Sequence, residues 1–344
     1  MNLKIPFFSE STVLINPINK TCYQNIKEGF VSIEIFGEKL DISFAECGSI
    51  DSPALVCLHG NSGSSQDFYK QFELLSNQYR VIAFDLPGHG KSSRVANDEN
   101  KEKIYSFPGY AQAIAKAIKA FGLNDIFVLG FSLGGHNALS FLAKQNDWND
   151  LEIKEIADKI KAMIIIGTPP LNLSLTNEEE LMGEFIKGFR NDFIDKLPPS
   201  VKMEMEELGI RNLIALISFD KNLNDGFQKS NRLAEFFITL LGIELNAENQ
   251  FMVEAVKNTC GEARKYMIAN MLKGGIDNQR TTVEEAKIPL LITAGEEDRG
   301  IDLGYLKTLN LPPAVQLKIL PGGHAIFLDN GFNDEIISFL NSIK

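Results

Sequence analysis

A serine flanked by glycines follows an apolar run in the middle of the chain. Residues 130–134 read Gly-Phe-Ser-Leu-Gly with Ser132 at the centre, after a run at 126–129 and before a stretch with helical spacing of apolar residues. A sharp strand-to-helix turn holds such a serine clear of a sheet but crowds the residues two before and two after it. Glycine at both positions relieves this crowding. The pattern predicts a strand, a tight turn and a helix whose N-terminal amides favour negative charge, with Ser132 as the candidate nucleophile.

Short β-branched runs alternate with longer helical patterns along much of the chain. This alternation is typical of the α/β class, with a mostly parallel sheet covered by helices. The expected strands are 31–36, 41–45, 54–58, 80–84, 126–130, 162–166, 290–293 and 315–320. The expected helices are 65–75, 110–121, 132–144, 151–160 and 333–343. We therefore expect an eight-stranded, mostly parallel sheet with flanking helices.

The alternation stops between Pro169 and Pro289. The intervening residues contain almost no strand-like run and many apolar positions spaced three or four apart, which is a helical pattern. We predict a helical cap at 171–286, inserted between a first core part at 1–170 and a last core part at 287–344. Six of the eight methionines fall in this cap, where they more often fill the space between helices than line a pocket.

The charge balance and the cysteines exclude several classes of protein. The chain has 344 residues and a net charge of −11, which argues against a nucleic-acid partner. No apolar stretch approaches the roughly 20 residues that a spanning helix needs, and the first residues lack a signal-peptide core. The four cysteines lack the spacing of a zinc site or a redox pair, and Cys57 reads as a buried thiol. The cytoplasm is the expected location.

A second glycine-rich loop follows the expected strand at 54–58. Acyl transfer passes through a tetrahedral oxyanion, which requires two N–H donors that converge on one oxygen. The amide of Leu133, directly after Ser132, supplies one donor, and the amide of Asn61 is the natural second. His59 in this loop, and His89 in the turn after the next strand, are interpreted as structural residues.

A serine nucleophile needs a base, and the base needs an acid that orients it. His324 lies in a loop between the last strand and the last helix, as a loop-mounted base should. His136 is less suitable, because one helical turn places it beneath Ser132. Three carboxylates follow the strand at 290–293, and Asp298 is preferred because the loop needs about two residues to turn inward. Glu297 is the alternative.

The chain order Ser132, Asp298, His324 is that of α/β-hydrolases, and residues 30–170 and 288–344 resemble this family. Further segments resemble the metal-independent N-acylhomoserine lactonases of this fold. They are HGNSGSS at 59–65, DLPGHGKS at 85–92, SLGGH at 132–136, GTPP at 167–170, the Gln-Arg pair at 279–280 and GGHAIF at 322–327. The resemblance implies that the triad opens a quorum-signal lactone without a metal. No cofactor is expected.

Other classes of protein share some of these motifs. Dehalogenases and epoxide hydrolases share the loop at 59–63 but use an aspartate nucleophile, which Ser132 excludes. A metal-dependent lactonase needs clustered histidines, and the four histidines here are otherwise assigned. A non-catalytic receptor on the same scaffold is less expected, because all three triad members are present. A general carboxylesterase, a lipase-like enzyme and a carbon–carbon-bond hydrolase stay open. The expected partner is a small neutral acyl ester or lactone.

Overall fold

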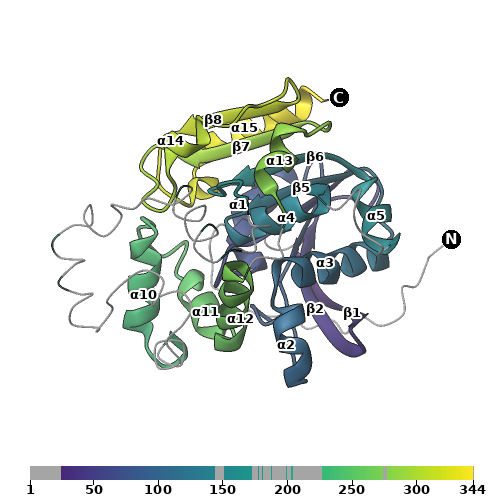
Figure 1. Cartoon of the computed structure of the whole chain (residues 1–344), viewed down its shortest axis with the longest axis vertical. Helices are drawn as coiled ribbons and strands as arrows, with labels where there is room; N and C mark the ends of the chain where they lie inside the picture. The colour runs from purple at the N-terminus through teal and green to yellow at the C-terminus, as the bar shows by residue number, and fades with distance from the viewer. Residues whose placement is uncertain are drawn as a thin grey trace.

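The structure, a computed structural model, describes residues 25–143, 151–172, 227–273 and 277–343, with single residues at 177, 180, 187, 199 and 203. Its centre is an eight-stranded sheet in the order β1-β2-β4-β3-β5-β6-β7-β8 (Figure 1). The strands are β1 (Lys27–Ile35), β2 (Glu38–Cys47), β3 (Ala54–Leu58), β4 (Arg80–Phe84), β5 (Ile126–Phe131), β6 (Ile160–Ile166), β7 (Leu290–Gly295) and β8 (Val315–Leu320). All eight strands expected from the sequence are present.

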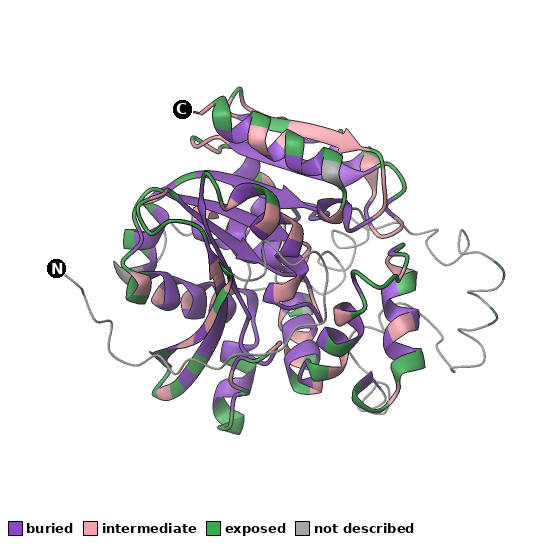
Figure 2. Ribbon diagram, turned by 180° about the vertical axis from the view of Figure 1, so that it is seen from behind, coloured by how far each residue is buried: buried purple, intermediate pink, exposed green. Residues whose placement is uncertain are grey.

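The pairing of the strands matches the predicted mostly parallel sheet. β2 is antiparallel to β1 and to β4, whereas all pairs from β4 through β8 are parallel. β3, β4, β5 and β7 are buried along their whole length. Parallel strands are usually buried on both faces, because their connections place helices there. The apolar runs of the sequence therefore form the interior layer of the molecule (Figure 2).

Successive residues of a strand point to opposite faces of the sheet and so enter two separate cores. Val56 and Leu58 pack in the cluster that contains α3 (Phe107–Phe121) and α4 (Leu133–Ala143). Leu55 and Cys57 pack in the cluster that contains α1 (Tyr69–Leu75) and α15 (Asn330–Asn341). Helices thus cover both faces, as the α/β class requires. Among the described residues, Cys47, Cys57 and Cys260 are buried free thiols, while Cys22 lies outside them.

Local signals explain where the helices begin and end. The Ser106 hydroxyl accepts a hydrogen bond of 3.0 Å from the Gly109 amide, and Gly122 ends α3 in the left-handed conformation, with φ 64°. α2 (Asp98–Ile104) was not expected, and the side chain of Asn97 caps it by accepting from Glu99 N. No helix of the described part is long and apolar enough to span a membrane.

Two expected helices differ in detail from the observed elements. The helix expected at 65–75 is a 3₁₀ turn, η2 (Ser65–Phe68), followed by α1. The helix expected at 151–160 ends earlier, as α5 (Leu151–Ala157). The end of that prediction is wrong because Ile160 pairs with Ile126 in the parallel ladder and already belongs to β6.

Helices occupy the described part of the predicted cap. They are α10 (Asn231–Leu240), α11 (Phe251–Asn258) and α12 (Gly261–Leu272), grouped on the side toward which the strand arrows point (Figures 1 and 2). α13 (Gln279–Glu284) packs against α4. Most of the chain between 173 and 226 lies outside the described residues, so the cap boundaries at 171 and 286 stay a prediction.

Candidate active site

Ser132 lies between β5 and α4 in a strained backbone conformation. Its φ is 51°, in the left-handed region that residues with a side chain rarely adopt. A Cβ on Gly130 would lie 2.5 Å from the Gly134 carbonyl oxygen, and a Cβ on Gly134 would lie 2.0 Å from that of Leu58. No side chain fits at either position. The turn therefore needs both glycines for the reason that the sequence pattern indicated.

The neighbouring strand β6 holds this turn in place. The Ser132 amide donates to the Ile166 carbonyl at 2.8 Å. The Thr168 hydroxyl lies 3.0 Å from the carbonyl oxygens of Ser132 and Ile166. A Cβ on Gly135 would lie 2.0 Å from the same hydroxyl, so α4 approaches Thr168 closely. These contacts fix the backbone on both sides of the serine.

Asp298 and His324 are brought together as the sequence predicted. Asp298 Oδ2 lies 2.8 Å from His324 Nδ1, and Asp298 is completely buried. Burial opposes ionisation of Asp298. Even so, the facing imidazole and the hydrogen bonds that Oδ1 accepts from the amides of Gly300 and Ile301, at 2.8 and 3.2 Å, lower its pKa. Glu297, the alternative acid, is exposed. The geometry favours Asp298 as the partner of His324.

The imidazole of His324 packs against the turn that carries Ser132. Its ring centroid lies 5.0 Å from that of Phe131, the residue directly before Ser132. A Cβ on Gly167, at the end of β6, would lie 2.8 Å from His324 Cε1. The absence of a side chain at Gly167 therefore lets the histidine approach the turn. Three segments far apart in the sequence meet here, and they follow the carboxyl ends of β5, β6 and β8.

The loop at 59–63, which we call the oxyanion loop, lies beside Ser132. A Cβ on Gly60 would lie 3.4 Å from the Ser132 Cβ and 2.8 Å from the Phe131 ring. The Gly63 amide closes a turn onto the Gly60 carbonyl at 3.1 Å, and Asn61 lies partly buried within that turn. Leu133, at the start of α4, is buried. Both expected oxyanion donors are thus on segments that flank Ser132, although their role stays a prediction.

His59 and His89 are buried next to this loop and support it. His59 Nε2 accepts a hydrogen bond from the Leu86 amide at 2.9 Å, so Nδ1 carries the proton and donates to the Gly60 carbonyl at 2.8 Å. The two histidine rings lie 5.1 Å apart. Burial lowers the pKa of both. Both side chains are therefore neutral near pH 7, which supports the structural interpretation.

The family assignment follows from a match over most of the chain. The family model described as alpha/beta hydrolase fold matches residues 53–331. The chain belongs to the alpha/beta hydrolase family.

Two curated relatives match only part of this chain. It is 32% identical over 140 residues to the proline iminopeptidase PfmaB of Pestalotiopsis fici, covering 40% of this chain and 43% of the relative. It is also 32% identical over 120 residues to the 2-hydroxy-6-oxononadienedioate/2-hydroxy-6-oxononatrienedioate hydrolase of Escherichia coli, covering 33% and 39%. The chain thus spans about two fifths of the length of these relatives.

Solved structures match this chain over nearly its whole length. A mutant of the N-acyl homoserine lactonase AidH, complexed with N-hexanoyl homoserine lactone, is 24% identical, with a TM-score of 0.65 and coverage of 92% of this chain and 98% of that one. The esterase RhEst1 from Rhodococcus sp. ECU1013 is 20% identical, with a TM-score of 0.61 and coverage of 93% and 100%. Likeness at these identities establishes the shared fold.

His136 is buried and held by two contacts behind the Ser132 turn. Its Nδ1 lies 2.7 Å from Gln279 Oε1, and its ring stacks on Phe107 with centroids 5.2 Å apart. Burial lowers the pKa of His136 to about 4, although the Gln279 contact opposes this. Gln279 Nε2 also donates to the His136 carbonyl at 3.1 Å. The Gln279 side chain therefore fixes the first turns of α4 behind the serine.

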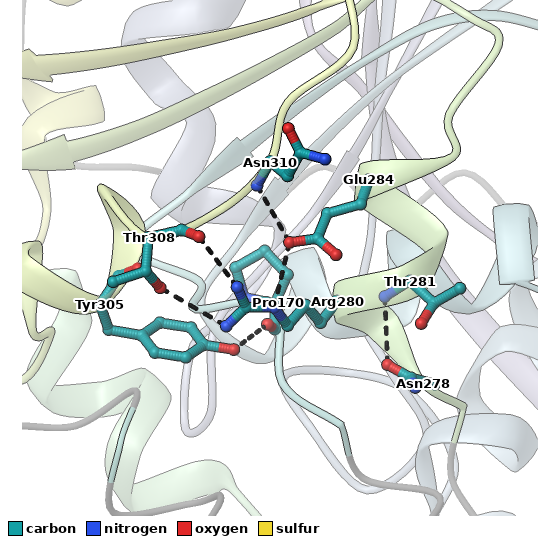
Figure 3. A network of polar contacts seen from close by, with 8 residues as sticks. All are labelled: Pro170, Asn278, Arg280, Thr281, Glu284, Tyr305, Thr308 and Asn310. Carbon is teal, nitrogen blue, oxygen red and sulfur yellow. Dashed lines mark hydrogen bonds and ion pairs between the residues drawn. The ribbon is translucent and has the colours of Figure 1, made fainter.

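The neighbouring Arg280 joins α13 to the loop after α14 (Leu303–Leu306), as Figure 3 shows. Its Nε lies 3.0 Å from Glu284 Oε1, and its Nη2 donates to the Thr308 carbonyl at 2.9 Å. Tyr305, whose ring lies under the guanidinium, donates its hydroxyl to the Pro170 carbonyl at 2.7 Å. The segments at 167–170 and 279–280, noted in the sequence only for their resemblance, thus form one support behind the Ser132 turn.

Two buried charged residues near the oxyanion loop were not identified from the sequence. Arg264 contacts Ser62 directly. Asp67 lies beneath the loop, where a Cβ on Gly63 would be 2.2 Å from Asp67 Oδ2, and burial raises the pKa of Asp67 to about 8. The spacing of Ser64 and Asp67 resembles a helix-capping pattern and could have marked the carboxylate. No local pattern marks Arg264.

Proposed function

We propose that the protein is a serine hydrolase that cleaves a carboxylic ester or lactone through an acyl-enzyme. The contact between Asp298 and His324, at 2.8 Å, carries this proposal, because it lies against the strained turn that presents Ser132. A buried carboxylate that holds the Nδ1 proton leaves Nε2 as the basic nitrogen of the imidazole. This arrangement suits proton transfer from a serine hydroxyl.

The proposed reaction begins when Ser132 Oγ attacks the carbonyl carbon while His324 Nε2 takes the hydroxyl proton. The amides of Asn61 and Leu133 bind the oxyanion, and Asp298 stabilises the imidazolium. Collapse of the tetrahedral intermediate breaks the acyl–oxygen bond, and His324 returns its proton to the leaving alkoxide. Water then attacks the acyl-enzyme with His324 again as the base. His324 returns this proton to Ser132 Oγ as the bond between the acyl carbon and Oγ breaks, and the acid is released. When the substrate is a lactone, the alkoxide stays tethered and the product is a single hydroxy acid.

An N-acylhomoserine lactone is the proposed substrate. Support comes from the motif segments described above and from the likeness to AidH bound to such a lactone. The charge of the predicted cap is also suitable, since residues 171–286 hold 19 acidic and 13 basic residues. A negative cap disfavours an anionic substrate, whereas these lactones are neutral.

Carbon–carbon bond hydrolysis is the second candidate. The observation that favours it is the 32% identity over 120 residues with the Escherichia coli 2-hydroxy-6-oxononadienedioate/2-hydroxy-6-oxononatrienedioate hydrolase. A Ser-His-Asp site serves either reaction, so the fold alone does not decide between them.

Initial rates on three substrate sets test the proposal with purified wild-type protein and the Ser132→Ala variant. The sets are N-acylhomoserine lactones of increasing chain length, p-nitrophenyl esters, and a 2-hydroxy-6-oxo-dienedioate. We expect lactone opening by the wild type and a loss of about 10³-fold or more in the variant. Strong ester turnover without lactone opening would indicate a general esterase, and turnover of the dienedioate alone would indicate the second candidate. A Ser132→Ala variant that keeps more than a few per cent of the rate would overturn the serine mechanism.

A further inference from the structure

Arg264, on α12, is a buried cation beside the oxyanion loop. Arg264 is 1% exposed, and no carboxylate of the described part of the chain forms an ion pair with it. Its Nε donates to Ser62 Oγ at 2.7 Å. The guanidinium also lies over the Phe227 ring, 5.0 Å from the centroid. A charge buried without a counterion is costly unless polar groups stabilise it, so these contacts indicate a specific role.

The end of α11 supplies the stabilising polar groups. Arg264 Nη2 donates to the Val256 carbonyl, and Nη1 donates to the Thr259 carbonyl at 3.4 Å. Carbonyls at the C-terminus of a helix carry partial negative charge and favour a cation. The guanidinium is therefore held at one end by the predicted cap, and Nε is left for the contact with Ser62.

Ser62 occupies an unfavourable backbone conformation in the oxyanion loop. Its φ is 65°, it is buried, and its hydroxyl is directed at Asn61 Oδ1 at 3.4 Å. The hydroxyl thus accepts from Arg264 and donates to Asn61. A left-handed residue with a side chain persists only where its surroundings hold it, and here the Arg264 contact does so.

Other contacts keep α12 in register with the core. The Cys260 amide donates to the Gly88 carbonyl at 2.7 Å, and Glu262 pairs with Lys101 of α2 at 2.8 Å. A Cβ on Gly88 would lie 2.9 Å from the Ala263 Cβ, which shows how closely the two segments pack. The helix that carries Arg264 is therefore fixed relative to the loop that it contacts.

We propose that Arg264 is a positioning residue that holds the oxyanion loop in its competent conformation through Ser62 and Asn61. The proposal rests on the serine-hydrolase function proposed above. It makes docking of α11 and α12 a condition for a complete oxyanion hole, so the predicted cap contributes to the chemical step as well as to substrate choice.

The effect of losing this contact is expected in kcat. The oxyanion exists in the transition state, whereas the substrate carbonyl is neutral, so a misplaced donor weakens transition-state binding more than substrate binding. A residue that only stabilises the fold would lower the melting temperature and leave the kcat of the folded fraction unchanged.

Steady-state kinetics of Arg264→Gln, Arg264→Lys, Ser62→Ala and the Arg264→Gln/Ser62→Ala double variant test the proposal. We expect Arg264→Gln and Ser62→Ala each to lower kcat by about 10-fold or more, with KM within about threefold. The double variant should be no worse than the more impaired of the two single variants, because both changes remove the contact between Arg264 and Ser62. Arg264→Lys should recover part of kcat and acquire a new fall in activity at alkaline pH, since a buried ammonium loses its proton more readily than a guanidinium.

Lys265→Gln is the matched control, because Lys265 is the exposed neighbour on the same helix, and its kcat should equal that of the wild type. If Arg264→Gln does not fold, Ser62→Ala still decides, since a wild-type kcat in that variant overturns the proposal. Ser132→Ala is assayed in parallel. An active Ser132→Ala would remove the proposed function itself, whereas an inactive Ser132→Ala with a wild-type kcat in Arg264→Gln would remove only the role of Arg264.

Discussion

Asp298 and His324, 26 positions apart in the chain, meet through a hydrogen bond of 2.8 Å between Oδ2 and Nδ1. The second carboxylate oxygen accepts two backbone amides, so the carboxylate cannot rotate without losing both. The acid is therefore fixed by its own loop before it contacts the histidine. The loop between β7 and α14 therefore determines how the carboxylate orients the imidazole of His324.

Replacing Asp298 by Asn should lower kcat/KM by about 10³- to 10⁴-fold, because an amide that donates to Nδ1 stabilises the wrong tautomer of His324. Glu297→Gln is the matched control, since Glu297 is adjacent in the sequence and exposed. Kinetics of both variants on the substrate that the wild type turns over fastest provide the measurement. The reverse outcome, with Glu297→Gln impaired and Asp298→Asn active, would move the acid role to Glu297.

Gly134→Ala should destabilise the fold, because the new methyl group would lie 2.0 Å from a backbone oxygen of Leu58 that cannot move away alone. We expect a loss of about 1–3 kcal/mol or more in the free energy of unfolding, measured by urea denaturation. Gly331→Ala provides the comparison, since nothing lies within 4 Å of a Cβ there and the helix α15 should gain stability. Equal stability of the two variants would contradict the steric account of the turn.

The sequence predicted the strands best where apolar runs are bounded by polar residues. β3, β4 and β8 begin and end where expected. α2 was missed because its seven residues, Asp-Glu-Asn-Lys-Glu-Lys-Ile, hold too few apolar positions to show a period, and its stability comes from the Asn97 cap and from packing on α3. Periodicity detects a helix only through its buried face.

Some residues of the candidate site could be predicted from the sequence and others could not. Ser132 and His324 could be placed because the turn and loop that carry them need glycine at defined positions, and glycine is visible in a sequence. The positions of Arg264 and Asp67 near the loop at 59–63 could not be predicted, because charged residues are rarely buried and only the tertiary structure shows that these two are. The link between His136 and Gln279 spans 143 residues and is equally invisible to local patterns.

Removing the partner of His136 should affect stability, whereas removing His324 should affect catalysis. Gln279→Ala leaves the buried His136 Nδ1 without its partner, so we expect a loss of about 1–3 kcal/mol in stability with kcat within about threefold of wild type. His324→Ala should instead abolish turnover with little change in stability. Thermal unfolding and steady-state kinetics of both variants make the comparison. A Gln279→Ala protein with normal stability but no activity would assign His136 a part in the chemistry.

Asp67 should make the stability of the protein fall as the pH rises. Burial raises the pKa of this carboxyl to about 8, from an ordinary 3.8, so between these values the folded state binds a proton that the unfolded state has released. This destabilisation is absent below about pH 4, grows between pH 4 and pH 8, and is complete above about pH 8, where it reaches at most about 6 kcal/mol.

Asp67→Asn keeps the shape of the protonated acid and removes this titration. The free energy of unfolding of both proteins is measured by urea denaturation at intervals from pH 4 to pH 9. The value for the variant should rise relative to that of the wild type as the pH rises, and the difference should level off above about pH 8. Taking the difference between the two proteins cancels the contribution of titrating groups that do not interact with Asp67. A difference that does not change with pH would show that Asp67 is already ionised in the folded protein at pH 5.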